Sequence, residues 1–142
     1  MSEGSLPAPP GSPPAARKPA KGDRIELLLD EIDERGRTLG SFEEFAVAVR
    51  GGVVRARALA RVQKRRRNGI EAVVEEERAP SPHAARARCP HVASCGGCSF
   101  QGLDYGAQLA AKERLLARIL APLAPLAIEP VLGCASPWNY RN

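Results

Sequence analysis

Apolar and polar side chains alternate along much of the first half of the chain. In "RIELLLDEID" apolar side chains recur at every second position, and "FAVAVR" repeats the pattern after a turn around "ERGRTLGS". A period of two is that of a β-strand with one buried face. The alternation predicts two strands. Their expected buried residues are Ile25, Leu27 and Leu29 in the first and Phe45, Val47 and Val49 in the second.

The stretch "VVRARALARVQK", residues 53–64, carries the clearest alternation. Every second residue is small and apolar, whereas Arg55, Arg57 and Arg61 stand between them. A helix would scatter these arginines around its circumference, but a strand places them on one face. We therefore predict a strand with an alanine-rich buried face and an arginine-rich exposed face.

Asn68–Gly69 marks a hairpin turn into a further strand, "IEAVVEEE". A three-residue loop would pair Val62 with Val74 and Arg61 with Glu75, which keeps the apolar positions on one face. A two-residue Asn-Gly loop would pair Val62 with Glu75 and mix the two faces. We predict the three-residue loop. Several short strands separated by turns indicate a mainly β fold, a small barrel or sandwich.

A helical period replaces the alternation after residue 103. In "DYGAQLAAKERLLARIL" one helical stripe collects most of the bulky side chains, and Asp104 suits the N-cap position. Pro122 is expected to end this helix, and "IEPVL", residues 128–132, suggests a further short strand. The predicted order is therefore strands, one helix and an extended connector. The stripe consists of Tyr105, Leu109, Lys112, Leu116, Ile119 and Leu120.

The composition fits a small core and an anionic partner. Of the 142 residues 44% are hydrophobic, much of that alanine, and only 4% are aromatic. The formal net charge of +5 favours a partner such as nucleic acid. Residues 1–21 are rich in proline and poor in bulky apolar side chains, so we expect a disordered leader and no secretory signal. Because no stretch is apolar enough for a membrane span, we expect a cytoplasmic protein.

Three cysteines lie close together in "RCPHVASCGGCSFQ". Cys89, Cys95 and Cys98 are spaced as ligands of a tetrahedral metal or of an iron–sulfur cluster, and the two glycines before Cys98 let two sulfurs approach one site. A disulfide is less expected in a reducing compartment. Spacing alone leaves zinc and iron–sulfur open. For zinc, the candidate fourth ligands are His83, His91 and Cys134.

Basic residues dominate the segment between Ala46 and Ile70, which contains eight of them and no acidic residue. Phosphate binding needs clustered positive charge of this kind. The alternative is a solvated strand face that Glu75 and its neighbours partly neutralise. Because the segment lacks stacking aromatics, we expect contacts to a nucleic-acid backbone and no reading of bases. The candidate binding residues are Arg55, Arg57, Arg61, Lys64, Arg65, Arg66 and Arg67.

Taken together, these stretches resemble the N-terminal part of the class I RNA uracil-C5 methyltransferases, a family that modifies ribosomal and transfer RNA. In that family a five-stranded barrel, the TRAM domain, precedes Cys-x5-Cys-Gly-Gly-Cys and a glutamine. A Tyr-x2-Gln-x3-Lys helix and a Pro-x2-Tyr-Arg-Asn segment follow. The resemblance covers roughly residues 22–142. The matching positions are Cys89, Cys95, Cys98, Gln101, Tyr105, Gln108, Lys112, Pro137, Tyr140, Arg141 and Asn142.

The resemblance implies an order of domains and a set of cofactors. An OB-like TRAM barrel would occupy residues 22–80, an iron–sulfur segment 81–103, and a helix that begins a central domain 104–142. The three clustered cysteines would hold a [4Fe-4S] cluster, and S-adenosylmethionine would serve the complete enzyme. The fourth cluster ligand and the catalytic residues of the family would lie beyond Asn142.

The resemblance also implies a cytoplasmic monomer that binds ribosomal or transfer RNA. By itself the chain is expected to bind RNA weakly and to catalyse nothing, because its sequence contains no glycine motif for S-adenosylmethionine. The alternative that the residues leave open is a stand-alone RNA-binding module that a zinc ion stabilises, without catalysis.

Overall fold

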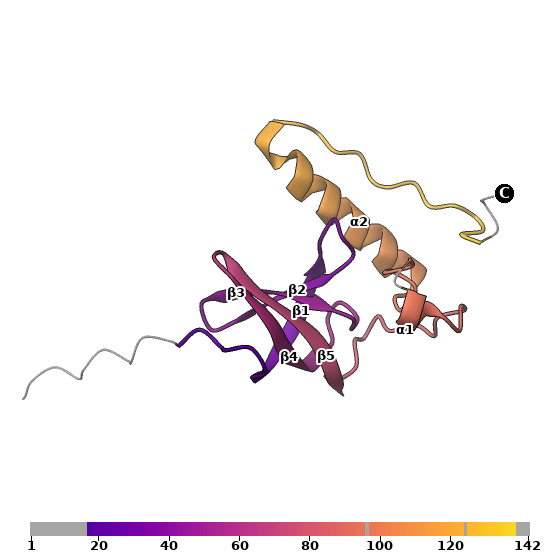
Figure 1. Cartoon of the computed structure of the whole chain (residues 1–142). Helices are drawn as coiled ribbons and strands as arrows, with labels where there is room; N and C mark the ends of the chain where they lie inside the picture. The colour runs from indigo at the N-terminus through magenta and orange to yellow at the C-terminus, as the bar shows by residue number, and fades with distance from the viewer. Residues whose placement is uncertain (1–16, 96, 124, 139–142) are drawn as a thin grey trace, which may run out of the picture.

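A closed five-stranded barrel is the main feature of the computed structural model, which describes residues 17–95, 97–123 and 125–138 (Figure 1). The strands follow one another around the barrel in the order β1-β2-β3-β5-β4. Neighbouring strands are antiparallel, except that β3 and β5 run parallel. The predicted mainly β fold is confirmed. The strands are β1 (Arg24–Ile32), β2 (Thr38–Phe42), β3 (Phe45–Arg50), β4 (Arg57–Arg66) and β5 (Gly69–Ala79).

Large and small side chains face each other inside the barrel. Leu27 of β1 pairs with Ala58 of β4, and Ile25 pairs with Ala60. A small barrel has little interior space, and pairing a bulky residue with a small one suits it. The predicted buried face of residues 54–62 is confirmed, because its apolar residues are at most 2% exposed. The alanines of β4 therefore serve to let the strands close into a barrel.

The strand register of the β4–β5 hairpin differs from the predicted one. Its loop has two residues, Arg67–Asn68, where three were predicted. An irregularity between Val62 and Lys64 then shifts the pairing, so that Val62 faces Ala72 instead of Val74. A β-bulge adds one residue to one strand, which restores the pairing of apolar positions after the shorter loop. The predicted register was wrong, although the predicted face is the buried one.

The strand predicted over residues 53–64 begins later than expected. Val54 and Arg55 form a turn, with Arg55 in the left-handed region at a φ of 72°, and β4 starts at Arg57. The N–H of Arg55 donates to the carbonyl oxygen of Leu29, so backbone bonding to β1 holds the turn. Arg55 is therefore not part of the arginine row on the strand.

The first residues that the structure describes lie against the barrel. Of the predicted disordered leader, residues 1–16 lie outside the described residues. The following residues have no regular secondary structure, but Pro19 is buried and Lys18 Nζ donates to the carbonyl oxygen of Arg66 at 2.6 Å. Packing thus begins before residue 22, where the barrel was expected to start.

Helices follow the barrel: α1 (Val92–Cys95), α2 (Tyr105–Leu120) and the 3₁₀ helix η1 (Ala121–Leu123). The predicted helix is confirmed, and the side chain of Asp104 caps it by accepting a hydrogen bond from the N–H of Ala107 at 2.8 Å. None of the helices in the described part of the chain has the length and apolar character that crossing a membrane requires.

The connector after η1 forms no strand, contrary to the expectation for residues 128–132. It runs back along α2 instead (Figure 1). The N–H of Val131 donates to Glu113 Oε1 and the N–H of Cys134 to the hydroxyl of Tyr105, each at 2.7 Å. Because a closed barrel offers no free edge to a further strand, side chains of α2 bind these backbone donors.

Candidate nucleic-acid interface and cysteine segment

The tip of the β4–β5 hairpin carries exposed positive charge. Lys64, Arg65 and Arg67 are exposed, and within the described part of the chain no ion pair joins them to a carboxylate. Between them, Arg66 forms a two-pronged contact with Glu71, Nε to Oε1 at 2.9 Å and Nη2 to Oε2 at 3.3 Å. Glu71 compensates only part of this charge, so the tip stays net positive, which is the property that attracts phosphate.

The other predicted binding arginines each contact a carboxylate. Arg61 pairs with Glu75, although its backbone partner is not the predicted one. Exposed pairs of this kind neutralise charge while adding little stability. The strand face is thus partly neutralised, and the hairpin tip is the more cationic part of the surface. The remaining pairs are Arg57 Nη1 with Glu26 Oε1 at 3.5 Å and Arg55 Nη1 with Asp30 Oδ1 at 3.9 Å.

The arginines hold two glutamates of β5 in their charged form. The hydrogen bond from Arg66 lowers the pKa of Glu71 below its ordinary value of 4.5. The hydrogen bond from Arg24, with a second one from Arg61, likewise lowers the pKa of Glu75. Both carboxylates are therefore ionised at neutral pH and compete with any anionic ligand for these arginines.

Gln101 closes the cysteine segment into a loop. Its Oε1 accepts a hydrogen bond from the N–H of Cys89 at 3.0 Å, and its own N–H donates to the carbonyl oxygen of Cys98 at 3.2 Å. One residue thus joins the first and the last cysteine of the segment. The residue pattern assigned Gln101 no role, and the only available signal was a glutamine at a fixed distance after the last cysteine.

The clustered cysteines are accessible but do not form a ready-made metal site. Cys89 is half-buried, Cys95 and Cys98 are exposed, and none is in a disulfide. Within the described ranges, no three His, Cys, Asp or Glu side chains gather closely enough to hold a metal ion. The donor set still fits an iron–sulfur cluster, because thiolates are the ligands of such clusters. Binding would have to draw the sulfurs together, as metal binding often does.

Two of the donors considered for zinc have other partners in the structure. The Nδ1 of His83 lies 3.3 Å from Asp104 Oδ2, and the thiol of Cys134 donates to the carbonyl oxygen of Ser136 at 3.1 Å. Neither side chain joins the clustered cysteines in a group of metal-binding donors. His91, the third candidate, likewise belongs to no group of metal-binding donors, so the described residues form neither a ready-made zinc site nor a ready-made cluster site.

A small apolar cluster fixes the cysteine segment to the barrel. Leu103 is buried against Ile32 and Val54, and the ring of Phe100 packs on the same cluster. The linker before the cysteines is held as well, because Ala84 forms a backbone bridge with Leu103. The cysteine loop thus has a defined position relative to the barrel surface.

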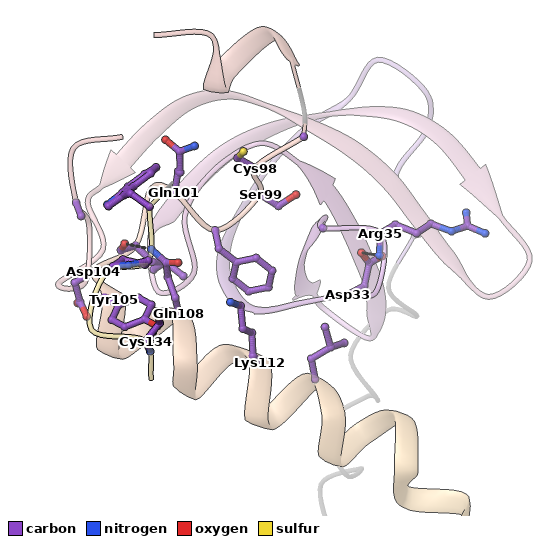
Figure 2. Close-up of a pocket in the computed structure, with 18 of the residues that line it drawn as sticks. Asp33, Arg35, Cys98, Ser99, Gln101, Asp104, Tyr105, Gln108, Lys112 and Cys134 are labelled. Carbon is purple, nitrogen blue, oxygen red and sulfur yellow. Dashed lines mark hydrogen bonds between the residues drawn. The ribbon is translucent and has the colours of Figure 1, made fainter. Parts of the chain in front are cut away.

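A cleft of about 1080 Å³ lies between the cysteine segment, α2 and the connector (Figure 2). Tyr105, Gln108 and Lys112 line it from α2, and Cys98 and Gln101 line it from the cysteine segment. The residues that carry the sequence resemblance on both segments therefore meet at one cleft. Pro137 also lines it, whereas Tyr140, Arg141 and Asn142 lie outside the described residues.

Two aromatic residues that line this cleft, Phe100 and Trp138, contact basic side chains. Lys112 Nζ lies 5.8 Å from the centroid of the Phe100 ring, and the Arg88 guanidinium lies 5.2 Å from that of Trp138. Contacts at these distances are cation–π interactions. They tie α2 and the connector to the cysteine segment, so the cleft is a packed junction of three segments.

The chain is a small closed barrel with a cationic hairpin and an attached cysteine segment, and comparison with known proteins shows what it is similar to. No protein-family model matches the chain. An uncharacterized RNA methyltransferase of Bacillus anthracis is 31% identical over 125 residues, which cover 85% of this chain and 27% of that protein. One from Thermosynechococcus vestitus is 34% identical over 125 residues, 86% of this chain and 28% of that protein.

A third relative matches a shorter stretch of the chain. An uncharacterized RNA methyltransferase of Caldanaerobacter subterraneus is 34% identical over 101 residues, 71% of this chain and 22% of that protein. These matches show that the chain is a relative of the RNA methyltransferase family. It spans about a quarter of the length of the relatives it matches.

Proposed function

We propose that this chain is the RNA-binding and [4Fe-4S]-binding part of an S-adenosylmethionine-dependent RNA uracil-C5 methyltransferase. The observation that carries the proposal is the match to RNA methyltransferases over 85% of the chain. The barrel with a cationic hairpin supports the RNA-binding role, and the cysteine spacing supports the cluster. The substrate class is ribosomal or transfer RNA, and the protein acts as a cytoplasmic monomer.

RNA binding is assigned to the exposed cations of the barrel. Lys64, Arg65 and Arg67 contact phosphates directly, because no ion pair within the described structure engages them. The arginines that are paired with carboxylates contribute less, since each must exchange a protein partner for a phosphate. The chain positions the RNA backbone and does not read bases.

The cluster is assigned to the loop that Gln101 closes. Cys89, Cys95 and Cys98 would hold it through their thiolates, and when bound it would supply a metal centre that stabilises the loop. The N–H of Cys89 is already bound to Gln101, so the first ligand starts from a fixed position. The family resemblance implies a fourth ligand outside the matched segment.

Methyl transfer is assigned to the part of the relatives outside the matched segment. The sequence contains no glycine motif for S-adenosylmethionine. We expect no methylation of RNA by the 142-residue chain alone. Turnover with S-adenosylmethionine in a methylation assay on this chain would contradict that assignment.

Reconstitution tests the cluster assignment. The chain is incubated anaerobically with iron and sulfide, and visible absorbance together with iron and sulfide content is measured. Substituting Cys89, Cys95 or Cys98 with serine is expected to abolish cluster binding, whereas Cys134→Ser is the matched control and is expected to preserve it. Stoichiometric zinc with no cluster would overturn the assignment and favour a zinc-stabilised module.

A further inference from the structure

A second basic surface lies between the barrel and the cysteine segment. It is a groove of about 900 Å³, which we call the arginine groove, bounded by β3 and β5 on one side and by Cys98 and Ser99 on the other. Glu71 is the acidic residue among the described residues that line it. The basic residues that line it are Arg35, Arg37, Arg50 and Arg66.

The arginines of the groove differ in how freely they can bind a ligand. Arg35 and Arg50 are exposed, and within the described residues no ion pair engages them. Arg37 and Arg66 both contact Glu71, through Arg37 Nη1 at 3.6 Å and Arg66 Nε at 2.9 Å. Arg35 also lines the neighbouring cleft, where Figure 2 shows its side chain pointing away from the labelled residues of α2. Two cations are thus open to a ligand, Glu71 holds Arg66, and Asp33 binds Arg37 more closely than Glu71 does, at 2.7 Å.

The walls of the groove suit a polyanionic strand. Gly51, in the left-handed region, adds no side chain to the groove, whereas neighbouring side chains pack closely on Gly52. Val53 and Val74 supply apolar contact, and no aromatic ring is among the described residues that line it. A surface with arginines and no stacking platform binds phosphates and does not stack bases.

The groove is continuous with the hairpin tip. Arg66 belongs to both, since its side chain lines the groove and its neighbours in the sequence are Arg65 and Arg67. At the other end the groove reaches Cys98. A strand bound at the tip would therefore pass along the groove toward the cysteine loop.

We propose that the arginine groove holds the phosphodiester backbone of the RNA strand, with Arg35 and Arg50 as direct contacts and Glu71 as a competitor of the phosphates. The inference rests on the proposed RNA-binding function and extends it to a surface that the hairpin does not include. Glu71 then lowers the affinity for RNA, because its carboxylate occupies Arg66 when no RNA is bound.

The first test removes the competing carboxylate. Binding of a fluorescein-labelled single-stranded RNA to the 142-residue chain is measured by anisotropy. Glu71→Gln should tighten binding about two- to fivefold, the range of one exposed charge interaction. Glu76→Gln is the matched control, because Glu76 lies on the same strand, pairs with Arg78 at 2.7 Å and changes the net charge equally. Glu76→Gln should change the RNA affinity only slightly.

The second test neutralises the open cations. Arg35→Gln with Arg50→Gln should weaken binding and reduce the magnitude of the slope of log affinity against log salt by about 1.4, since each contact to single-stranded nucleic acid contributes about 0.7. Arg78→Gln with Arg114→Gln removes the same net charge outside the groove and should leave the slope almost unchanged. Circular dichroism of every variant verifies folding.

The outcomes separate this inference from the proposed function. If the wild-type chain binds RNA, yet Glu71→Gln and the Arg35–Arg50 pair behave like their controls, the groove is not on the RNA path and only this inference fails. If the wild-type chain binds no RNA, the proposed function fails together with it. Tighter binding by Glu71→Gln and a reduced slope for the arginine pair support the groove.

Discussion

At the scale of single residues, Asp33 shows how a charge is held inside this small protein. Its side chain is 5% exposed, and Oδ1 accepts hydrogen bonds from the N–H groups of Arg35 and Arg37 at 2.9 and 2.8 Å. Arg37 also binds Oδ2 through its guanidinium at 2.8 Å. Burial raises the pKa of Asp33, but the bonds from Arg37 and Arg35 outweigh it and lower the pKa below 3.8. Asp33 thus fixes the turn that leads into β2.

Asp33→Ala is expected to destabilise the fold by about 2 kcal/mol, because it leaves two backbone donors without an acceptor. The pKa of Asp33 is lower in the folded state, so its contribution is present at neutral pH. It is lost as pH falls through the folded pKa, below the ordinary value of 3.8. Urea unfolding of the wild type and of Asp33→Ala, at neutral and at acidic pH, measures the free energy of unfolding of each. If the stability difference between them does not shrink in acid, the stabilising role of the Asp33 carboxylate is contradicted.

At the scale of elements, some features of the β4–β5 hairpin were predictable from the local sequence and others were not. Alternation identified the buried face of β4, because burial inside a barrel imposes a period of two on the side chains. It did not reveal the bulge near Gln63 or the left-handed turn at Arg55, since both depend on hydrogen bonds to other strands. The Asp104 cap was predictable because a cap is a local contact.

The cysteine loop is the element whose geometry depends most on one side chain. Gln101→Ala removes the acceptor of the Cys89 N–H and should cost about 1 kcal/mol of local stability, or about fivefold faster exchange of that amide hydrogen. Hydrogen–deuterium exchange followed by NMR measures it. Gln108→Ala is the matched control. Gln108 lies on α2, and its substitution also removes one side-chain hydrogen bond, from Nε2 to the carbonyl oxygen of Leu103. Equal Cys89 exchange in wild type and Gln101→Ala would refute the role of Gln101.

At the scale of the whole molecule, the distribution of charge decides which predicted residues matter. The sequence grouped the basic residues by their position on one hairpin, and it anticipated Glu75 as a partner. It could not reveal that Glu26 and Asp30 of β1 reach Arg57 and Arg55, because these pairs form only when the barrel closes. The arginine groove was hidden for the same reason, since its arginines come from separate segments.

The three clustered thiols, unlike the ion pairs, were visible as a group in the sequence. Their spacing and the resemblance together predict a cluster, and the chain supplies an accessible, Gln101-closed loop that contains all three. Among the described residues the three sulfurs do not gather into a group of metal-binding donors. The metal-binding role of Cys89, Cys95 and Cys98 therefore stays a prediction.

The RNA-binding role is tested most directly by comparing two triple variants in an RNA titration at several salt concentrations. Neutralising the unpaired tip with Lys64→Gln, Arg65→Gln and Arg67→Gln should reduce the magnitude of the salt slope by about 2, at about 0.7 per lost phosphate contact.

The comparison variant carries Arg55→Gln, Arg57→Gln and Arg61→Gln, which remove equal charge from the ion-paired arginines. We predict that its salt slope falls by less than half as much as that of the tip variant. Equal slopes for wild type and the tip variant, or a larger loss in the comparison variant, would contradict the assignment of RNA binding to the hairpin tip.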